Sequence, residues 1–81
     1  MKRKPEEKWT TYDLGVAAAL LCSGYKLSSI DRTNPRRSLF VFRHSAKIDD
    51  TANAYIADCL KLKARSFFDQ LKALKNRLYG E

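Results

Sequence analysis

The chain has 81 residues, of which 44% are hydrophobic and 31% are charged, and its formal net charge at pH 7 is +7. This length corresponds to one domain, and a domain of this size buries only about 60% of the surface of its unfolded chain. The hydrophobic content argues against a wholly disordered chain. We therefore expect a single folded domain of modest stability with a largely ionic surface.

The N-terminal segment does not have the pattern of a targeting signal. Met1-Lys-Arg-Lys is followed by Pro5-Glu6-Glu7-Lys8, where a signal peptide would have its apolar region. The longest apolar run, Val16–Cys22, has seven residues, whereas a transmembrane helix needs about 20. We expect a cytoplasmic protein without a membrane partner, in which residues 1–8 form a flexible basic arm and residues 9–81 form one α+β domain.

A short buried helix is predicted directly after the arm. Thr10 suits the N-cap position, and Leu14 is placed to pack back on Trp9. Gly24 suits the position after the helix, where glycine adopts a positive φ at little cost. The residues expected to face the core repeat at helical spacing and are Leu14, Ala17, Ala18, Leu21 and Cys22.

Residues 25–43 predict a β-hairpin. Asn34 and Pro35 suit the first two positions of a type I turn, because asparagine can hydrogen-bond forward to the backbone and proline's fixed φ matches the turn. Centring the turn on Asn34-Pro35 or on Pro35-Arg36 shifts the pairing by two residues, which leaves the side-chain faces unchanged. We expect a core face with Leu27, Phe40 and Phe42 and an opposite face with Ile30, Leu39 and Val41.

The C-terminal half predicts two helices. Asp49 or Asp50 is expected to cap the first of them, whose apolar residues are Ala52, Tyr55, Ile56, Cys59 and Leu60. Apolar residues continue at nearly the same helical spacing through Leu78, so a single helix from Asp50 to Tyr79 is the alternative. Such a helix would extend about 45 Å, which is long for a compact domain with a radius of gyration near 12 Å.

We therefore predict a break at residues 60–63 and a third helix from Ala64 to Tyr79, ended by Gly80. Its expected core face is Phe67, Leu71, Leu74 and Leu78. The predicted fold is a single small α+β domain of order α-β-β-α-α, in which a two-stranded antiparallel hairpin packs on the helices.

Three short motifs occur in order along the chain. The first predicted helix contains Leu-Gly-x-Ala-Ala-x-Leu followed by Gly24-Tyr25, the hairpin contains the Asn34-Pro35 turn, and the last helix ends in Leu74-Lys75-x-Arg77-x-Tyr79. From about Trp9 to Tyr79 the chain resembles a family of small domains of unknown function found in bacteria and their mobile elements. The resemblance implies no activity and no site residue, because the family has no assigned function.

The residues that usually perform catalysis or bind metals form no recognisable set. Cys22 and Cys59 stand alone in apolar patterns, so we expect free, buried thiols. With His44 as the one histidine, the chain does not offer four zinc ligands at a suitable spacing. A nucleophile with its base and a glycine-rich phosphate loop are also missing. We expect no metal, no cofactor and no enzymatic activity.

The positive charge is unevenly distributed. Residues 61–79 hold six basic side chains against Asp69 alone, a net charge of +5. Arg65, Lys72 and Lys75 form one stripe at helical spacing with Phe68 at its border, and the arm adds Lys2, Arg3, Lys4 and Lys8. The candidate nucleic-acid-binding residues are Arg32, Arg36, Arg37, Arg43, Lys61, Arg65, Lys72 and Lys75.

This charge favours a small accessory domain that binds nucleic acid through phosphates with little sequence specificity. The simpler explanation is that lysine and arginine favour the helix and keep it soluble, that Arg32, Arg36 and Arg37 satisfy Asp31 and loop carbonyls, and that the Phe68 ring lies in the core rather than on a base. The alternative function is a protein-interaction or homodimerisation module that uses the hairpin edge and its apolar face, formed by Ile30, Leu39 and Val41.

Overall fold

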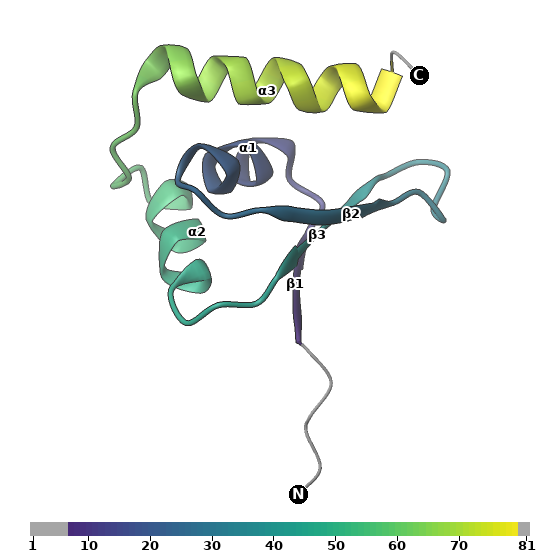
Figure 1. The fold of residues 1–81 in the computed structure, drawn as a ribbon, viewed down its shortest axis with the longest axis horizontal. Helices are drawn as coiled ribbons and strands as arrows, with labels where there is room; N and C mark the ends of the chain where they lie inside the picture. The colour runs from purple at the N-terminus through teal and green to yellow at the C-terminus, as the bar shows by residue number, and fades with distance from the viewer. Residues whose placement is uncertain (1–6, 80–81) are drawn as a thin grey trace, which may run out of the picture.

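The computed structural model describes residues 7–79. Within them, a three-stranded antiparallel sheet and three helices occur in the order β1 (Lys8–Thr11), α1 (Leu14–Cys22), β2 (Leu27–Asp31), β3 (Leu39–Arg43), α2 (Ile48–Ile56) and α3 (Ala64–Tyr79) (Figure 1). The α+β class is confirmed, and so is the order α-β-β-α-α for the elements from α1 onward. The sheet has three strands rather than two, because β1 precedes the first helix and pairs with β3, which lies between β1 and β2.

The start of the domain differs from its prediction, because Lys8–Thr11 form a strand. Trp9 pairs with Phe42, and their rings pack edge to face with centroids 6.3 Å apart. Thr10 therefore does not cap α1 and Trp9 is not the residue before the cap. Asp13 is the N-cap, and its carboxylate accepts a hydrogen bond of 3.0 Å from the Val16 N–H. Residues 1–6 of the expected arm, including Lys2, Arg3 and Lys4, lie outside the described residues, as does Gly80.

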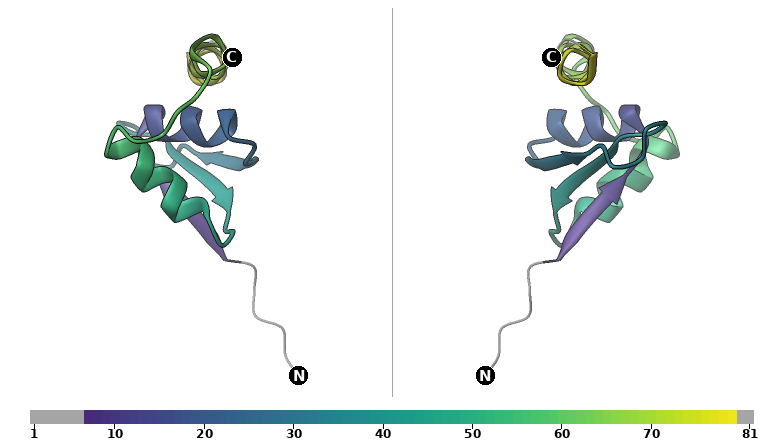
Figure 2. Two further views of the ribbon diagram at one scale, coloured as in Figure 1. Left: turned by 90° about the vertical axis from the view of Figure 1, so that its left-hand side faces the viewer. Right: turned by 90° about the vertical axis from the view of Figure 1, so that its right-hand side faces the viewer.

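α1 is the central element of the fold. It lies between the sheet and α3, and α2 packs beside it (Figures 1 and 2). Val16–Leu20 are buried in an unbroken run, because small side chains let neighbours approach α1 from several directions. The predicted face left out Val16, Ala19 and Leu20, which are buried. It included Leu21 and Cys22, which are only half-buried. The core around α1 is completed by Phe40, Phe42, Ile48, Ala52 and Leu74.

The hairpin turn forms where the sequence predicts it. The Arg37 N–H donates to the Asn34 carbonyl oxygen over 3.4 Å, which closes a four-residue turn with Pro35 at its second position. The Asn34 side-chain oxygen accepts a hydrogen bond of 2.8 Å from the Arg36 N–H. This is the forward side-chain bond for which asparagine is favoured in turns.

The predicted faces of the hairpin are confirmed except at Ile30. Leu27 pairs with Phe42 on the core face, but an irregularity between Leu27 and Ser29 shifts the register, so that Ile30 pairs with Phe40. Directly paired residues point to the same face. Ile30 therefore belongs to the core face, where it packs on the core. Leu39 and Val41 lie on the opposite side, which we call the outer face of the sheet.

Two helices end in the same hydrogen-bond motif. After α1, Gly24 has a φ of 104°, and the Tyr25 and Gly24 N–H groups bond to the carbonyls of Leu20 and Leu21. After α2, Asp58 has a φ of 62° and the corresponding bonds join Cys59 to Ala54 and Asp58 to Tyr55. Both are Schellman motifs, which stop a helix through one left-handed residue. The break before α3 is thus confirmed, together with the start of α3 at Ala64, and α3 continues to Tyr79, the last residue that the structure describes.

α2 differs from its prediction at both ends. Its N-cap is Lys47, which makes no side-chain capping bond, while Asp49 and Asp50 lie in the first turn. Ile48, which the sequence analysis did not place in the core, is fully buried. The helix stops at Ile56, so Cys59 lies beyond it and is exposed. Both cysteines are free, as expected, but neither is fully buried.

Candidate nucleic-acid interface

One edge of α3, beside the face that packs on the core, carries a regular row of cations and aromatic rings. The core face is the predicted one, with Leu74 fully buried and Phe67, Leu71 and Leu78 half-buried. At 100° per residue, a second set of side chains with alternating spacings of three and four positions shares one edge of the helix, about 100° around its axis from the core face. We call this set the α3 stripe; it consists of Arg65, Phe68, Lys72, Lys75 and Tyr79.

The Phe68 ring lies on the surface, whereas the simpler explanation of the sequence placed it in the core. It is 52% exposed, and the Lys72 ammonium lies 5.6 Å from the ring centroid, within cation–π range. At the start of the stripe, the Arg65 Nε lies 3.4 Å from the Asp69 carboxylate. Both partners of this pair are largely exposed, and such pairs contribute little net energy. Arg65 therefore stays accessible to a competing anion.

The three arginines of the β2–β3 loop lie beside the C-terminal end of α3. Arg32 reaches across to α3, where its Nη2 donates a hydrogen bond of 2.5 Å to the Arg77 carbonyl oxygen. That carbonyl is one of the last four in the helix, which have no partner within it. Arg37 lies over the Tyr12 ring, with its guanidinium carbon 3.9 Å from the ring centroid.

Asp31 is satisfied by the loop backbone and not by the arginines. Its carboxylate accepts hydrogen bonds from the Thr33 N–H at 2.9 Å and from the Thr33 hydroxyl at 2.5 Å. These bonds, the side-chain one first, hold the pKa of the Asp31 carboxyl below its ordinary value. Among residues 7–79 no ion pair joins Asp31 to Arg32, Arg36 or Arg37. The expectation that these arginines neutralise Asp31 is therefore wrong.

A cleft of about 430 Å³ opens between the β2–β3 loop and the end of α3. Apolar side chains of Leu14, Phe40 and Leu78 line part of it. Its polar and aromatic lining includes Arg32, Arg36, Arg37, Tyr12 and Tyr79. We call it the arginine cleft. Tyr79 belongs both to this cleft and to the α3 stripe, so the two form one continuous surface.

The structure does not bring all of the predicted residues together. Arg43 ends β3 away from the hairpin loop, and its strand partner there is Lys8. Lys61 lies in the connector between α2 and α3, at the opposite end of α3 from the loop (Figure 1). Six of the eight candidates therefore share the stripe and the cleft; they are Arg32, Arg36, Arg37, Arg65, Lys72 and Lys75.

Two tyrosines of this surface were missed by the sequence analysis. Tyr79 could have been found by continuing the spacing of the stripe one step beyond Lys75. Tyr12 had no such signal, because it lies between β1 and α1 and reaches the cleft only through the fold. Predicting Tyr79 thus required extending the spacing of the stripe, and predicting Tyr12 required the tertiary structure.

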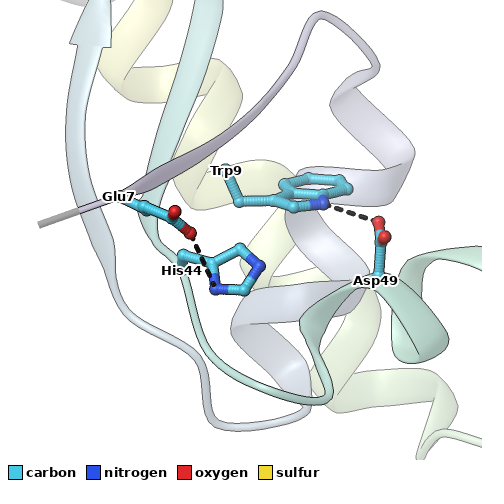
Figure 3. A network of polar contacts seen from close by, with 4 residues as sticks. All are labelled: Glu7, Trp9, His44 and Asp49. Atoms are coloured by element: carbon cyan, nitrogen blue, oxygen red, sulfur yellow. Dashed lines mark hydrogen bonds and ion pairs between the residues drawn. The ribbon is translucent and has the colours of Figure 1, made fainter.

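A separate polar network fastens β1 to its neighbours (Figure 3). The Trp9 indole N–H donates a hydrogen bond of 2.8 Å to Asp49 in the first turn of α2. His44, just after β3, has its Nδ1 3.9 Å from the Glu7 carboxylate, and the backbone N–H of His44 donates to the Glu7 carbonyl oxygen. We interpret this network as structural. In the described part of the chain, no three His, Cys, Asp or Glu side chains cluster as a metal site would require.

Comparison with known proteins identifies a family. A domain of unknown function, DUF5659, matches residues 6–80. The chain belongs to this family. The match confirms the resemblance in the sequence, while the bacterial and mobile-element setting stays a prediction. No curated protein and no solved structure matches the chain. Over residues 7–79, none of the helices has the length and apolar character needed to cross a membrane.

Proposed function

We propose that this domain binds nucleic acid through phosphate contacts, with little sequence specificity, as a cytoplasmic accessory domain. The observation that carries the proposal is the continuity of the α3 stripe and the arginine cleft through Tyr79. One nucleic-acid ligand can therefore contact the cations of both the β2–β3 loop and α3. Neutralising several phosphates in a row releases counterions, which supplies affinity without reading the bases.

The residue types on this surface suit phosphates better than base edges. Arginine offers a planar fork of donors that matches a phosphate, and lysine acts as a compact positive charge. Base-specific contacts need side chains held rigidly at the floor of a groove, commonly asparagine, glutamine or arginine on a recognition helix. The exposed cations of the stripe lie on the edge of a helix whose neighbouring face is packed on α1. We therefore expect similar affinities for unrelated sequences.

The alternative, a protein-interaction or homodimerisation module, has a smaller apolar surface than the sequence suggested. Of its three candidate residues, Ile30 belongs to the core face and Val41 is only 7% exposed. Leu39 is half-buried on the outer face. We keep this function as the outcome to accept if nucleic acid does not bind.

The proposal is tested by titrating the protein against fluorescently labelled duplex DNA and single-stranded RNA at several salt concentrations. With roughly three to five phosphates contacted, log K should fall against log salt with a slope of about −3 to −5 on duplex DNA. Replacing Arg36, Arg37, Arg65 and Lys72 together with glutamine should flatten this slope. Circular dichroism should show an unchanged fold, since all four side chains are exposed.

A matched control removes four positive charges elsewhere on the surface. Lys8, Lys26, Lys47 and Lys63 are exposed and lie outside the stripe and the cleft. Replacing these four lysines with glutamine gives the same net charge, and the slope should stay close to that of the unmodified protein. Equal losses in both variants would mean that no particular surface binds. If neither nucleic acid binds at micromolar concentration in low salt, the proposal is wrong.

A further inference from the structure

Exposed aromatic rings accompany the cations of the proposed interface. Among residues 7–79 the large hydrophobic side chains that are exposed are Tyr12 at 44%, Ile56 at 68%, Phe68 at 52% and Tyr79 at 80%. The three aromatic ones all lie on the stripe or in the cleft: Tyr12 lies under Arg37, Phe68 lies near Lys72, and Tyr79 lines the cleft together with the loop arginines. Single exposed apolar residues are common. Three rings that share one basic surface are typical of a surface that stacks flat ligands.

Resting on the proposed function, we infer that the ligand is a single strand of nucleic acid whose bases stack on Phe68 and Tyr79. The two rings are separated by about 16 Å along α3 at 1.5 Å per residue. Lys72 and Lys75 lie between them on the same edge of the helix. A strand laid along this edge meets, in turn, a ring, two cations and a second ring.

Base stacking separates single strands from duplexes. In a duplex both faces of each base are covered by its neighbours, so only base edges and phosphates are presented to a protein. An unpaired strand presents base faces as well, and every base has such a face, so stacking on an aromatic side chain tolerates any sequence. Rings at Phe68 and Tyr79 therefore add affinity for single strands, whereas the cations serve both forms.

The arginine cleft provides a place for a phosphate at the end of this path. Its volume of about 430 Å³ lies within the range of pockets that hold small ligands. Arg36 and Arg37 bring forked donors to it, and Tyr12 backs the Arg37 guanidinium. Arg32 uses one donor on the Arg77 carbonyl, and its guanidinium has five N–H donors in all. The cleft thus receives the strand's backbone beside the ring of Tyr79.

The test compares one labelled oligonucleotide as a single strand and as a duplex with its complement, at a fixed salt concentration. The single strand should bind more tightly. Phe68→Leu and Tyr79→Leu keep an apolar side chain and remove the ring, and each should weaken single-strand binding by about 5- to 100-fold. The salt slope should not change, because neither substitution removes a phosphate contact. Duplex affinity should change little.

Phe68→Tyr and Tyr79→Phe are the matched controls, since they keep a ring at each position and should keep the affinity. Equal or tighter binding of the duplex would overturn the inference, as would leucine variants that bind like the unmodified protein. In either case the charge-dependent binding in the glutamine experiment would still stand. Failure of both forms to bind at low salt would instead overturn the proposed function and this inference together.

Discussion

The Arg32 guanidinium and the Arg77 carbonyl oxygen are joined by a hydrogen bond of 2.5 Å across 45 positions of sequence. This bond links the β2–β3 loop to the last turn of α3, and these are two walls of the arginine cleft. It also satisfies a helix-end carbonyl with a positively charged donor, where the helix dipole favours positive charge. The cleft is therefore held in shape by one of its own arginines.

Arg32→Gln should loosen this connection. We expect the free energy of unfolding to fall by about 1 kcal/mol, as for a hydrogen bond at an exposed site, and amide exchange in the last turn of α3 to become faster. Urea unfolding and hydrogen exchange measure the two effects. Arg36→Gln removes the same charge from the same loop and should leave both quantities unchanged. If the two variants behave alike, the bond does not stabilise the end of α3.

Gly15 is required by the close approach of Tyr55 to α1. A Cβ atom at Gly15 would lie 2.5 Å from the Tyr55 hydroxyl oxygen and 3.3 Å from Cζ of the ring. The Tyr55 ring also packs on Phe67, with centroids 6.0 Å apart, which limits its retreat. Gly15→Ala should therefore destabilise the domain by about 1–2 kcal/mol, although alanine is the better helix former by about 1 kcal/mol.

In a Tyr55→Phe background the hydroxyl oxygen is gone, and Gly15→Ala should cost at least about 1 kcal/mol less than in the unmodified protein. Thermal or urea unfolding of the four proteins in this cycle measures the coupling between the two positions. Additive effects would show that the helix, and not the tyrosine hydroxyl, decides the cost of a side chain at Gly15.

Ala18 tests the central place of α1. It is fully buried in the run Val16–Leu20, so Ala18→Glu would place a charge where it has neither water nor a partner. We expect loss of the cooperative thermal transition. Ala73→Glu is the control, because Ala73 is exposed on α3 and its substitution should change stability by less than about 0.5 kcal/mol. A normal melt for Ala18→Glu would remove α1 from the core.

Asp31 gives the hairpin loop a dependence on acid pH. Its pKa is lowered because the Thr33 hydroxyl and N–H bond to the carboxylate. The resulting stabilisation is present above the pKa of the unfolded chain and is lost as the pH falls through the lower folded-state pKa. Thr33→Val should raise the pKa of Asp31 in an NMR titration, whereas Thr33→Ser should keep it low. An unchanged pKa in the valine variant would exclude the hydroxyl as the main cause.

Local patterns in the sequence predicted much of the fold. The bounds and core face of α3 follow from the spacing of its apolar residues, because a helix places positions three and four apart on one face. Gly24 and the Asn34-Pro35 turn follow from backbone preferences of single residues. The basic part of the α3 stripe was also predictable from the helical spacing of its residues. Each of these signals acts between residues that are close in sequence.

The tertiary structure decided the rest. β1 forms because Trp9 and its neighbours pair with β3, whose residues are distant in sequence, and a four-residue segment has little strand signal of its own. The shift that turns Ile30 to the core arises in the pairing of β2 with β3. The arginine cleft exists only where the β2–β3 loop meets α3. These features depend on contacts between different elements of the fold. Such contacts produce no periodicity or motif within a short stretch of sequence, so the sequence alone does not predict them.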